Sequence, residues 1–148
     1  TPEERIEVLE VMEPMMGLLG RTAARAFQKS LHLSQMKKVI AQLDECTKTN
    51  DPALFSHARR NFYSTLLEIG GNRELARFFS TIHMQVIYLQ YQSARFQEMR
   101  ISDYRQICKA VIAGDIKAAE SVAKKFVQSA RALIVQSIQS SARTAIAV

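Results

Sequence analysis

Histidines, cysteines and paired carboxylates are the side chains that commonly bind metals or catalyse reactions. Their arrangement in this chain indicates neither a metal site nor a catalytic site. His32, His57 and His83 fall on different expected elements and share no metal-ligand spacing. We interpret each as a surface or boundary residue rather than a ligand. Cys46 and Cys108 both lie in helical patterns, where a free cysteine behaves as a small buried apolar group.

Sequence signatures of enzymes are also missing. The chain has no glycine-rich phosphate loop, no GxSxG, no HExxH and no CxxC. Glu10 and Glu13 lie three residues apart on one expected helix, but acids in the first turns of a helix ordinarily offset its dipole. We therefore expect no catalytic residue, no cofactor and no enzyme activity.

Length and composition are those of one globular domain. The 148 residues are 47% hydrophobic and 23% charged, which excludes a disordered tail and predicts a single domain over residues 1–148. No stretch reaches 18 apolar residues, and the first residues do not resemble a signal peptide. Two cysteines are too few for a disulfide framework, so we expect a cytoplasmic protein with no membrane contact.

The charge is unevenly distributed. Five glutamates and one arginine occupy residues 3–13, so the rest of the chain has 19 basic and 9 acidic side chains. A basic surface can attract nucleic acid or anionic ligands. Because the basic residues are scattered, in pairs such as Lys37-Lys38 and Arg59-Arg60, the pattern favours a solvated surface over direct contact with nucleic acid.

Apolar residues recur at steps of three or four along nearly the whole chain, which predicts helices throughout. The first helix begins with Thr1 as N-cap, Pro2 at the first helical position and Glu4 completing a capping box. Its apolar stripe continues in phase to Phe27, so Pro14 is expected to kink this helix without ending it.

Turn and cap residues divide the rest of the chain into five further helices. Residues 31–33 are interpreted as a connector, Gly70-Gly71 and Gly114 as stops, and the tail from Ser137 as frayed helix. Helix starts are predicted at Ser34, Asp51-Pro52, Asn72, Ser102 and Asp115. The predicted fold is all-α, an antiparallel bundle of about six helices.

The last helix has apolar residues on more than one face. Val127, Ile134 and Ile138 lie off the stripe that runs through Phe126 and Leu133. A bundle of this size needs one inward stripe per helix, so the additional apolar surface predicts a partner. We expect a two-fold symmetric homodimer.

Three separated patterns together resemble the effector domain of FadR-type regulators in the GntR superfamily of bacterial transcription factors. Residues 9–15, LEVMEPM, resemble the opening "R-x-x-L-E-P" helix of that family. Residues 61–66, NFYSTL, followed by Gly71-Asn72, resemble "D-x-x-F-H-x-x-L" and the glycine-asparagine that ends it. Residues 103–119 resemble "E-H-x-x-I-x-x-A-I-x-x-G-D-x-x-x-A".

The resemblance covers nearly the whole chain and implies a FadR C-terminal-domain-like fold. Such a domain dimerises, binds a small effector and follows an N-terminal winged helix-turn-helix. The chain starts at the first effector-domain helix, so we expect DNA to be bound only through that additional module. The alternative is a helical dimerisation module with no small-molecule site.

The residues that hold a divalent metal in many family members are replaced here. By resemblance, the aspartate position is Arg59 and the three histidine positions are Tyr63, Tyr104 and Phe126. The family's arginine near the start of the first helix falls at Leu9 and is lost too. We therefore expect no metal at this site.

Two interpretations of the replaced positions remain open. In one, these four residues form a metal-free effector site, in which the guanidinium of Arg59 holds an organic acid or another anionic metabolite. Tyr63 and Tyr104 would then supply hydroxyls, and Phe126 an apolar wall. In the other, the three aromatic side chains fill the former cavity while Arg59 extends outward to solvent.

Overall fold

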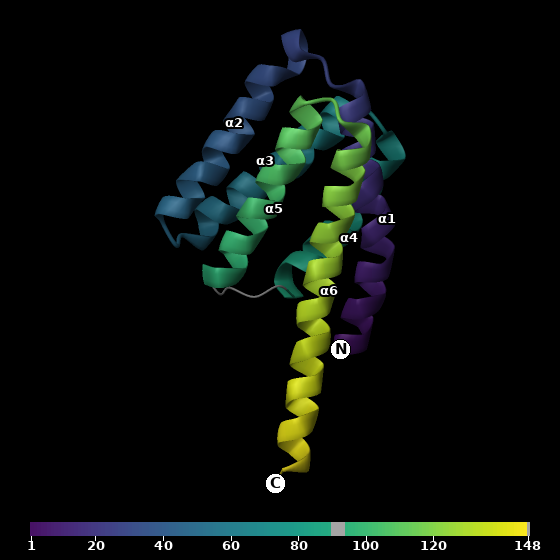
Figure 1. The fold of residues 1–148 in the computed structure, drawn as a ribbon, viewed down its shortest axis with the longest axis vertical. Helices are drawn as coiled ribbons and strands as arrows, with labels where there is room; N and C mark the ends of the chain where they lie inside the picture. The colour runs from purple at the N-terminus through teal and green to yellow at the C-terminus, as the bar shows by residue number, and fades with distance from the viewer. Residues whose placement is uncertain (90–93, 148) are drawn as a thin grey trace.

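The chain folds into six helices in the parts that the structure covers (Figure 1). This computed structural model describes residues 1–89 and 94–147, without the side chains of residues 2, 83–89 and 94. The predicted all-α bundle is confirmed. The helices are α1 Pro2–Ala26, α2 Lys29–Lys48, α3 Pro52–Gly70, α4 Arg73–Leu89, α5 Ala94–Ile112 and α6 Ile116–Ile146.

The predicted caps explain where most of these helices begin and end. Thr1 and Glu4 form the capping box of α1, and the helix continues through Pro14. The Asp51 carboxylate accepts a hydrogen bond from the Ala53 amide at the start of α3. Gly71 ends α3 with φ +70°, a left-handed conformation that glycine adopts without steric cost.

Two helices begin earlier than the sequence predicted. α2 starts at Lys29, so residues 31–33 are helical rather than a connector, and Ser34 is not its cap. The Gln28 amide donates a hydrogen bond to Nδ1 of His32, and this local contact supports the early start. α5 starts at Ala94, eight residues before the predicted start at Ser102.

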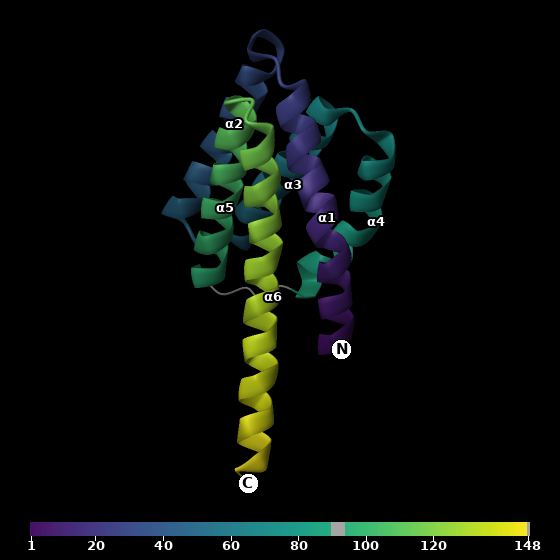
Figure 2. The ribbon, with the colours of Figure 1, turned by 45° about the vertical axis from the view of Figure 1, so that its right-hand side comes forward.

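The sequence also placed the end of α6 too early. The helix continues to Ile146 instead of fraying from Ser137. Hydroxyls along this segment bond back to carbonyls four residues earlier, as Ser140 does to Gln136 and Thr144 to Ser140. Figures 1 and 2 both show this end of α6 extending past the other helices of the bundle.

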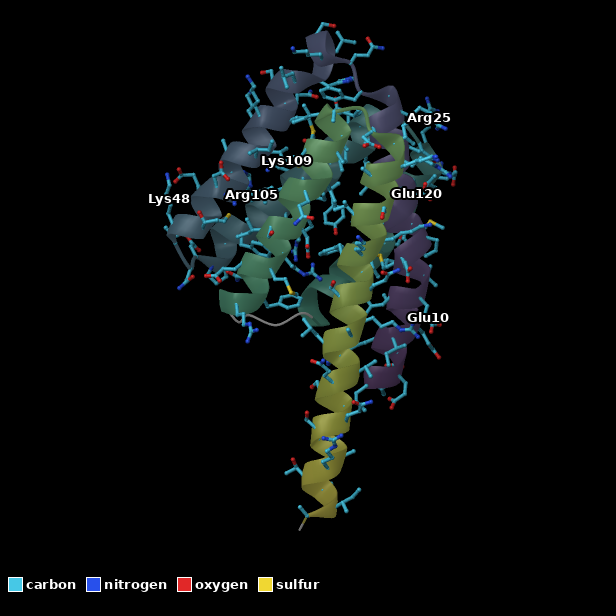
Figure 3. All side chains as sticks on the ribbon, viewed as in Figure 1. Glu10, Arg25, Lys48, Arg105, Lys109 and Glu120 are labelled. Atoms are coloured by element: carbon cyan, nitrogen blue, oxygen red, sulfur yellow. The ribbon has the colours of Figure 1, made fainter. Side chains whose placement is uncertain are left out.

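α1 and α6 pack along each other. Gly20 lies directly against Ala119, where a Cβ on the glycine would be 2.5 Å from the Ala119 carbonyl oxygen. Farther along the interface, Arg131 pairs with Glu10 at 2.8 Å, and Figure 3 shows Glu10 on the α1 side of this contact. The glutamates of α1 thus do more than offset its dipole, because Glu13 also accepts a hydrogen bond from Gln128.

The apolar residues that predicted a dimer are largely covered within the chain itself. Val127 and Ile134 are buried, and Ile138 packs against the core at intermediate exposure. Long side chains that remain exposed on α6 include Leu133 and Ile146. The original argument for a partner therefore does not hold, and any partner surface on α6 would have to involve its projecting end.

Candidate effector site

α3 carries the first two candidate residues, Arg59 and Tyr63, one helical turn apart on its inward face. Both are buried, with 7% of Arg59 and 5% of Tyr63 exposed. The guanidinium carbon of Arg59 lies 5.8 Å from the ring centroid of Phe55, one turn earlier on the same helix. Arg59 therefore does not extend outward to solvent.

The other two candidates come from α5 and α6 and meet Tyr63 in the bundle interior. Tyr104 on α5 has its ring centroid 5.9 Å from that of Tyr63 and 5.4 Å from that of Phe126 on α6. Residues that the sequence separates by more than sixty positions are thus brought into one cluster. The structure thus brings three of the four candidates into ring contact, and Arg59 lies one turn before Tyr63 on α3.

Further aromatic side chains pack around Tyr104 and Tyr63. The Phe62 ring lies 4.4 Å from that of Tyr104, and the Phe79 ring lies 5.4 Å from that of Tyr63. Tyr104 has no exposed surface. The rings thus occupy the middle of the cluster, as the second interpretation of the sequence expected, while the burial of Arg59 agrees with the first.

The guanidinium of Arg59 has no counter-ion among the residues that the structure describes. Its Nε is buried without a hydrogen-bond partner, and no described carboxylate pairs with it. Burial lowers the pKa of Arg59, although Tyr104 and Tyr63 oppose this shift. A guanidinium nevertheless stays protonated in proteins, so a positive charge is fixed inside the bundle.

A second buried arginine, Arg100, belongs to the same cluster and was missed by the sequence analysis. Its side chain is 4% exposed, and its guanidinium carbon lies 4.8 Å from the Phe96 ring centroid and 4.7 Å from that of Phe126. Its Nη1 donates a hydrogen bond of 3.3 Å to the Tyr104 hydroxyl, while its Nε has no partner.

The signal for Arg100 was present in the sequence. It precedes Tyr104 by four residues, as Arg59 precedes Tyr63, and this spacing places both members of a pair on one helix face. Because the predicted start of the helix is Ser102, Arg100 lies outside the predicted helix and its pairing with Tyr104 is not predicted.

Acidic side chains near the cluster do not neutralise it. Asp103 is at intermediate exposure, and burial raises the pKa of its carboxyl while the charge of Arg100 lowers it. No described carboxylate pairs with Arg100 either.

Burial, reinforced by Tyr104, raises the pKa of the Tyr63 hydroxyl well above its usual range. This phenol is thus neutral near pH 7 and able to donate a hydrogen bond.

Comparison with known proteins identifies the fold and the family. The sequence model of the FCD domain matches residues 5–129. The chain belongs to the FCD domain family. FCD domains are C-terminal domains of GntR-family regulators, which confirms the resemblance found in the sequence.

A solved structure shares the fold of this FCD domain. It is described as "Metal-free FCD domain of TM0439 a putative transcriptional regulator" and matches with a TM-score of 0.67. The match covers 94% of both chains at 14% sequence identity, a level that establishes the shared fold alone. A comparison with curated proteins finds no relative of significant similarity.

The divalent metal that the resemblance implies for many relatives does not fit the residues of this FCD domain. Arg59 and Phe126 cannot ligate a divalent cation, and a neutral phenol such as Tyr63 is a poor ligand. Among the described side chains, no group of three or more histidines, cysteines, aspartates or glutamates is placed to hold a metal. The site therefore cannot use the ligand set of those relatives.

The two cysteines lie outside the cluster of the four candidate residues. Cys46 and Cys108 are buried free thiols, and burial raises the pKa of Cys108 to about 12. Within the described part of the chain, no helix combines the length and apolar character that crossing a membrane requires.

Proposed function

We propose that this FCD domain, residues 1–148, is the ligand-sensing and dimerisation part of a GntR-superfamily transcriptional regulator. It binds a small anionic effector, most simply an organic acid, and DNA is contacted only by an attached N-terminal winged helix-turn-helix. Arg59, Tyr63, Tyr104 and Phe126 form the effector site. The domain works without a metal or other cofactor and in the cytoplasm.

The observation that carries the proposal is the buried guanidinium of Arg59, which forms no ion pair with a described carboxylate and whose Nε has no hydrogen-bond partner. Taking an ion out of water costs several kcal/mol unless a partner compensates. A carboxylate or phosphate matches the planar fork of a guanidinium and forms strong charge-assisted hydrogen bonds with it. An anionic effector would supply the missing partner, and its apolar body would lie against the neighbouring rings.

The position of Phe126 suggests how occupancy would be transmitted. Phe126 lies on α6, which packs closely on α1 through Gly20 and Ala119 and through the ion pair of Arg131 with Glu10. In this proposal α1 is the helix that follows the DNA-binding module. An effector that favours one packing of α6 on α1 would shift the population of dimer geometries and thereby change operator binding.

The homodimer is part of this proposal. It is supported by the family to which the chain belongs and by the projecting end of α6. That end exposes 86% of Ile146, and Leu133 is also exposed farther back on the same helix. A second copy would cover these residues.

The packed rings support a second candidate function. Tyr104 is fully buried and contacts Phe62, Tyr63 and Phe126, so the aromatic side chains occupy the place of a ligand. On this alternative the domain only dimerises. Arg59 would then be a residual charge held by the Phe55 ring and by water at its small exposed edge.

A thermal-shift screen of carboxylates and phosphorylated metabolites distinguishes the two functions. We expect one or more acids to stabilise the wild type and not Arg59→Gln. Arg60→Gln is the matched control, because Arg60 is the adjacent arginine on α3 and is exposed. A ligand at 100 times its dissociation constant stabilises a fold by about 2.7 kcal/mol. If no acid stabilises the wild type, the dimerisation-only function replaces the proposal.

A further inference from the structure

Two arginine-tyrosine pairs of the same spacing converge from α3 and α5. Arg59 precedes Tyr63 and Arg100 precedes Tyr104 by one helical turn, and the two tyrosine rings lie in contact. Both arginines are more than nine-tenths buried, and the Nε of each is buried without a hydrogen-bond partner. The cluster therefore contains two fixed positive charges instead of the single one expected from the sequence.

The contacts of Arg100 orient its charge but do not neutralise it. The rings of Phe96 and Phe126 lie within 5 Å of its guanidinium carbon and fix the side chain between α5 and α6. The Tyr104 hydroxyl accepts one hydrogen bond from Nη1, while a guanidinium has five N–H donors. The buried Nε has no hydrogen-bond partner, so this donor is available for a charged partner.

Both charges act on the same small region of the bundle. Arg59 and Arg100 interact electrostatically with one another and with Tyr63. Two like charges in a poorly solvated interior repel each other, and one carboxylate would offset only half of the excess. The carboxylate of Asp103 interacts electrostatically with Arg100, but neither it nor any other described carboxylate forms an ion pair with either arginine.

We propose that the site selects a small organic dianion, with one negative group held by Arg59 and the other by Arg100. This inference rests on the proposed effector function and adds Arg100 to the effector-binding residues. The shared chemistry is two negative charges on one compact molecule, which a dicarboxylate or a phosphate monoester can supply. The surrounding rings contact the carbon skeleton between the charged groups.

Matched ligands test this selection on the purified domain. Calorimetric titration compares succinate with monomethyl succinate, and glycerol 3-phosphate with its methyl phosphodiester. Each pair has nearly the same size but differs by one negative charge. A charge-assisted hydrogen bond contributes about 1.5–3 kcal/mol, so we expect the dianion of at least one pair to bind the wild type about ten- to hundredfold more tightly. The pair that shows this difference distinguishes a dicarboxylate from a phosphate ester.

Variants then assign the second charge to Arg100. Arg100→Gln should reduce the affinity for the preferred dianion to that for its monoanionic partner. Arg95→Gln, which removes an exposed arginine five residues earlier on α5, should leave the dianion preference intact. Circular dichroism establishes that each variant is folded. If Arg100→Gln does not fold, the comparison of matched ligands on the wild type still decides between one charge and two.

The outcomes separate this inference from the proposed function. Equal binding of monoanion and dianion to the wild type, lost in Arg59→Gln, overturns the dianion inference and leaves the anionic effector in place. A dianion preference that survives in Arg100→Gln shows that Arg100 only positions Tyr104 and Phe126, and it also overturns the inference. Failure of all four compounds to bind, together with no hit in the broader acid screen, overturns both.

Discussion

The guanidinium carbon of Arg100 lies 4.7 Å from the ring centroid of Phe126, so a buried cation on α5 is held against α6. By the resemblance to FadR-type regulators, Phe126 stands at a position that implies a metal-binding histidine in many family members. Here a fixed guanidinium contacts two of the four corresponding side chains, Tyr104 and Phe126.

Replacing Arg59 by an apolar side chain should stabilise the ligand-free domain. Exchanging a buried charge for a hydrophobic side chain of similar volume often gains about 1–4 kcal/mol, so we expect Arg59→Met to raise the free energy of unfolding. For a domain of this size the corresponding increase in Tm is about 2–4 °C per kcal/mol. Urea unfolding monitored by circular dichroism measures it.

A matched substitution shows whether burial is the cause of this gain. Arg60→Met removes an exposed neighbouring charge and should change the stability by less than about 0.5 kcal/mol. A loss of stability in Arg59→Met would mean that the charge is already compensated within the fold. That result would remove the main support for an anionic effector.

Two glycines of α1 should respond in opposite ways to alanine. In Gly20→Ala the new Cβ would meet the backbone carbonyl of Ala119, which cannot move without shifting α6, so we expect a loss of about 1–3 kcal/mol. In Gly17→Ala the Cβ would meet mainly the flexible side chain of Lys124. Alanine favours a helix by about 1 kcal/mol over glycine, so this variant should be neutral or more stable.

Thermal unfolding of the two alanine variants checks this packing. An equal gain of stability in both would indicate that neither Cβ meets an obstacle and that alanine acts only through the helix backbone. The result would then contradict the close approach of α1 and α6 on which the proposed transmission depends.

Stoichiometric metal should be absent from the bundle interior. None of the four family positions offers an imidazole or a carboxylate, so dialysis against zinc, nickel and manganese should leave less than about 0.1 metal ion per chain. Elemental analysis measures this ratio. One tightly bound ion per chain that persists when the surface histidine His57 is replaced would refute the prediction.

The domain should be a dimer at tens of micromolar. The exposed apolar residues on the projecting end of α6 and the family resemblance both lead to this expectation. Light scattering coupled to size-exclusion chromatography gives the mass directly. A monomer mass would contradict the proposed dimer. In that case Ile146→Ser shows whether the exposed Ile146 side chain affects only the solubility of the domain.

Local signals in the sequence predicted much of the fold. The capping box at Thr1 and Glu4, the Asp51 cap and the left-handed Gly71 all lie where the sequence indicated. These signals succeed because each depends on backbone hydrogen bonds within one turn. The predicted start of α5 at Ser102 was wrong, and the early turns of this helix are held by contacts such as that of Arg100 with Phe126.

The contact between the aromatic candidates was predictable from the sequence, whereas the second buried arginine was not. The family pattern indicated that Arg59, Tyr63, Tyr104 and Phe126 would converge, and Tyr104 indeed contacts both Tyr63 and Phe126. Whether Arg59 points inward depends on packing between helices, which periodicity does not encode. The burial of Arg100 likewise depends on packing, because it results from rings on two different helices.

Native mass spectrometry of freshly purified protein tests the central claim, that Arg59 holds an anionic effector without a metal, most directly. We predict that the wild type and the matched control Arg60→Gln carry the added mass of a small organic acid, and that Arg59→Gln does not. A bound divalent metal, the absence of any acid on the wild type, or an adduct that Arg59→Gln retains in full would each contradict the account.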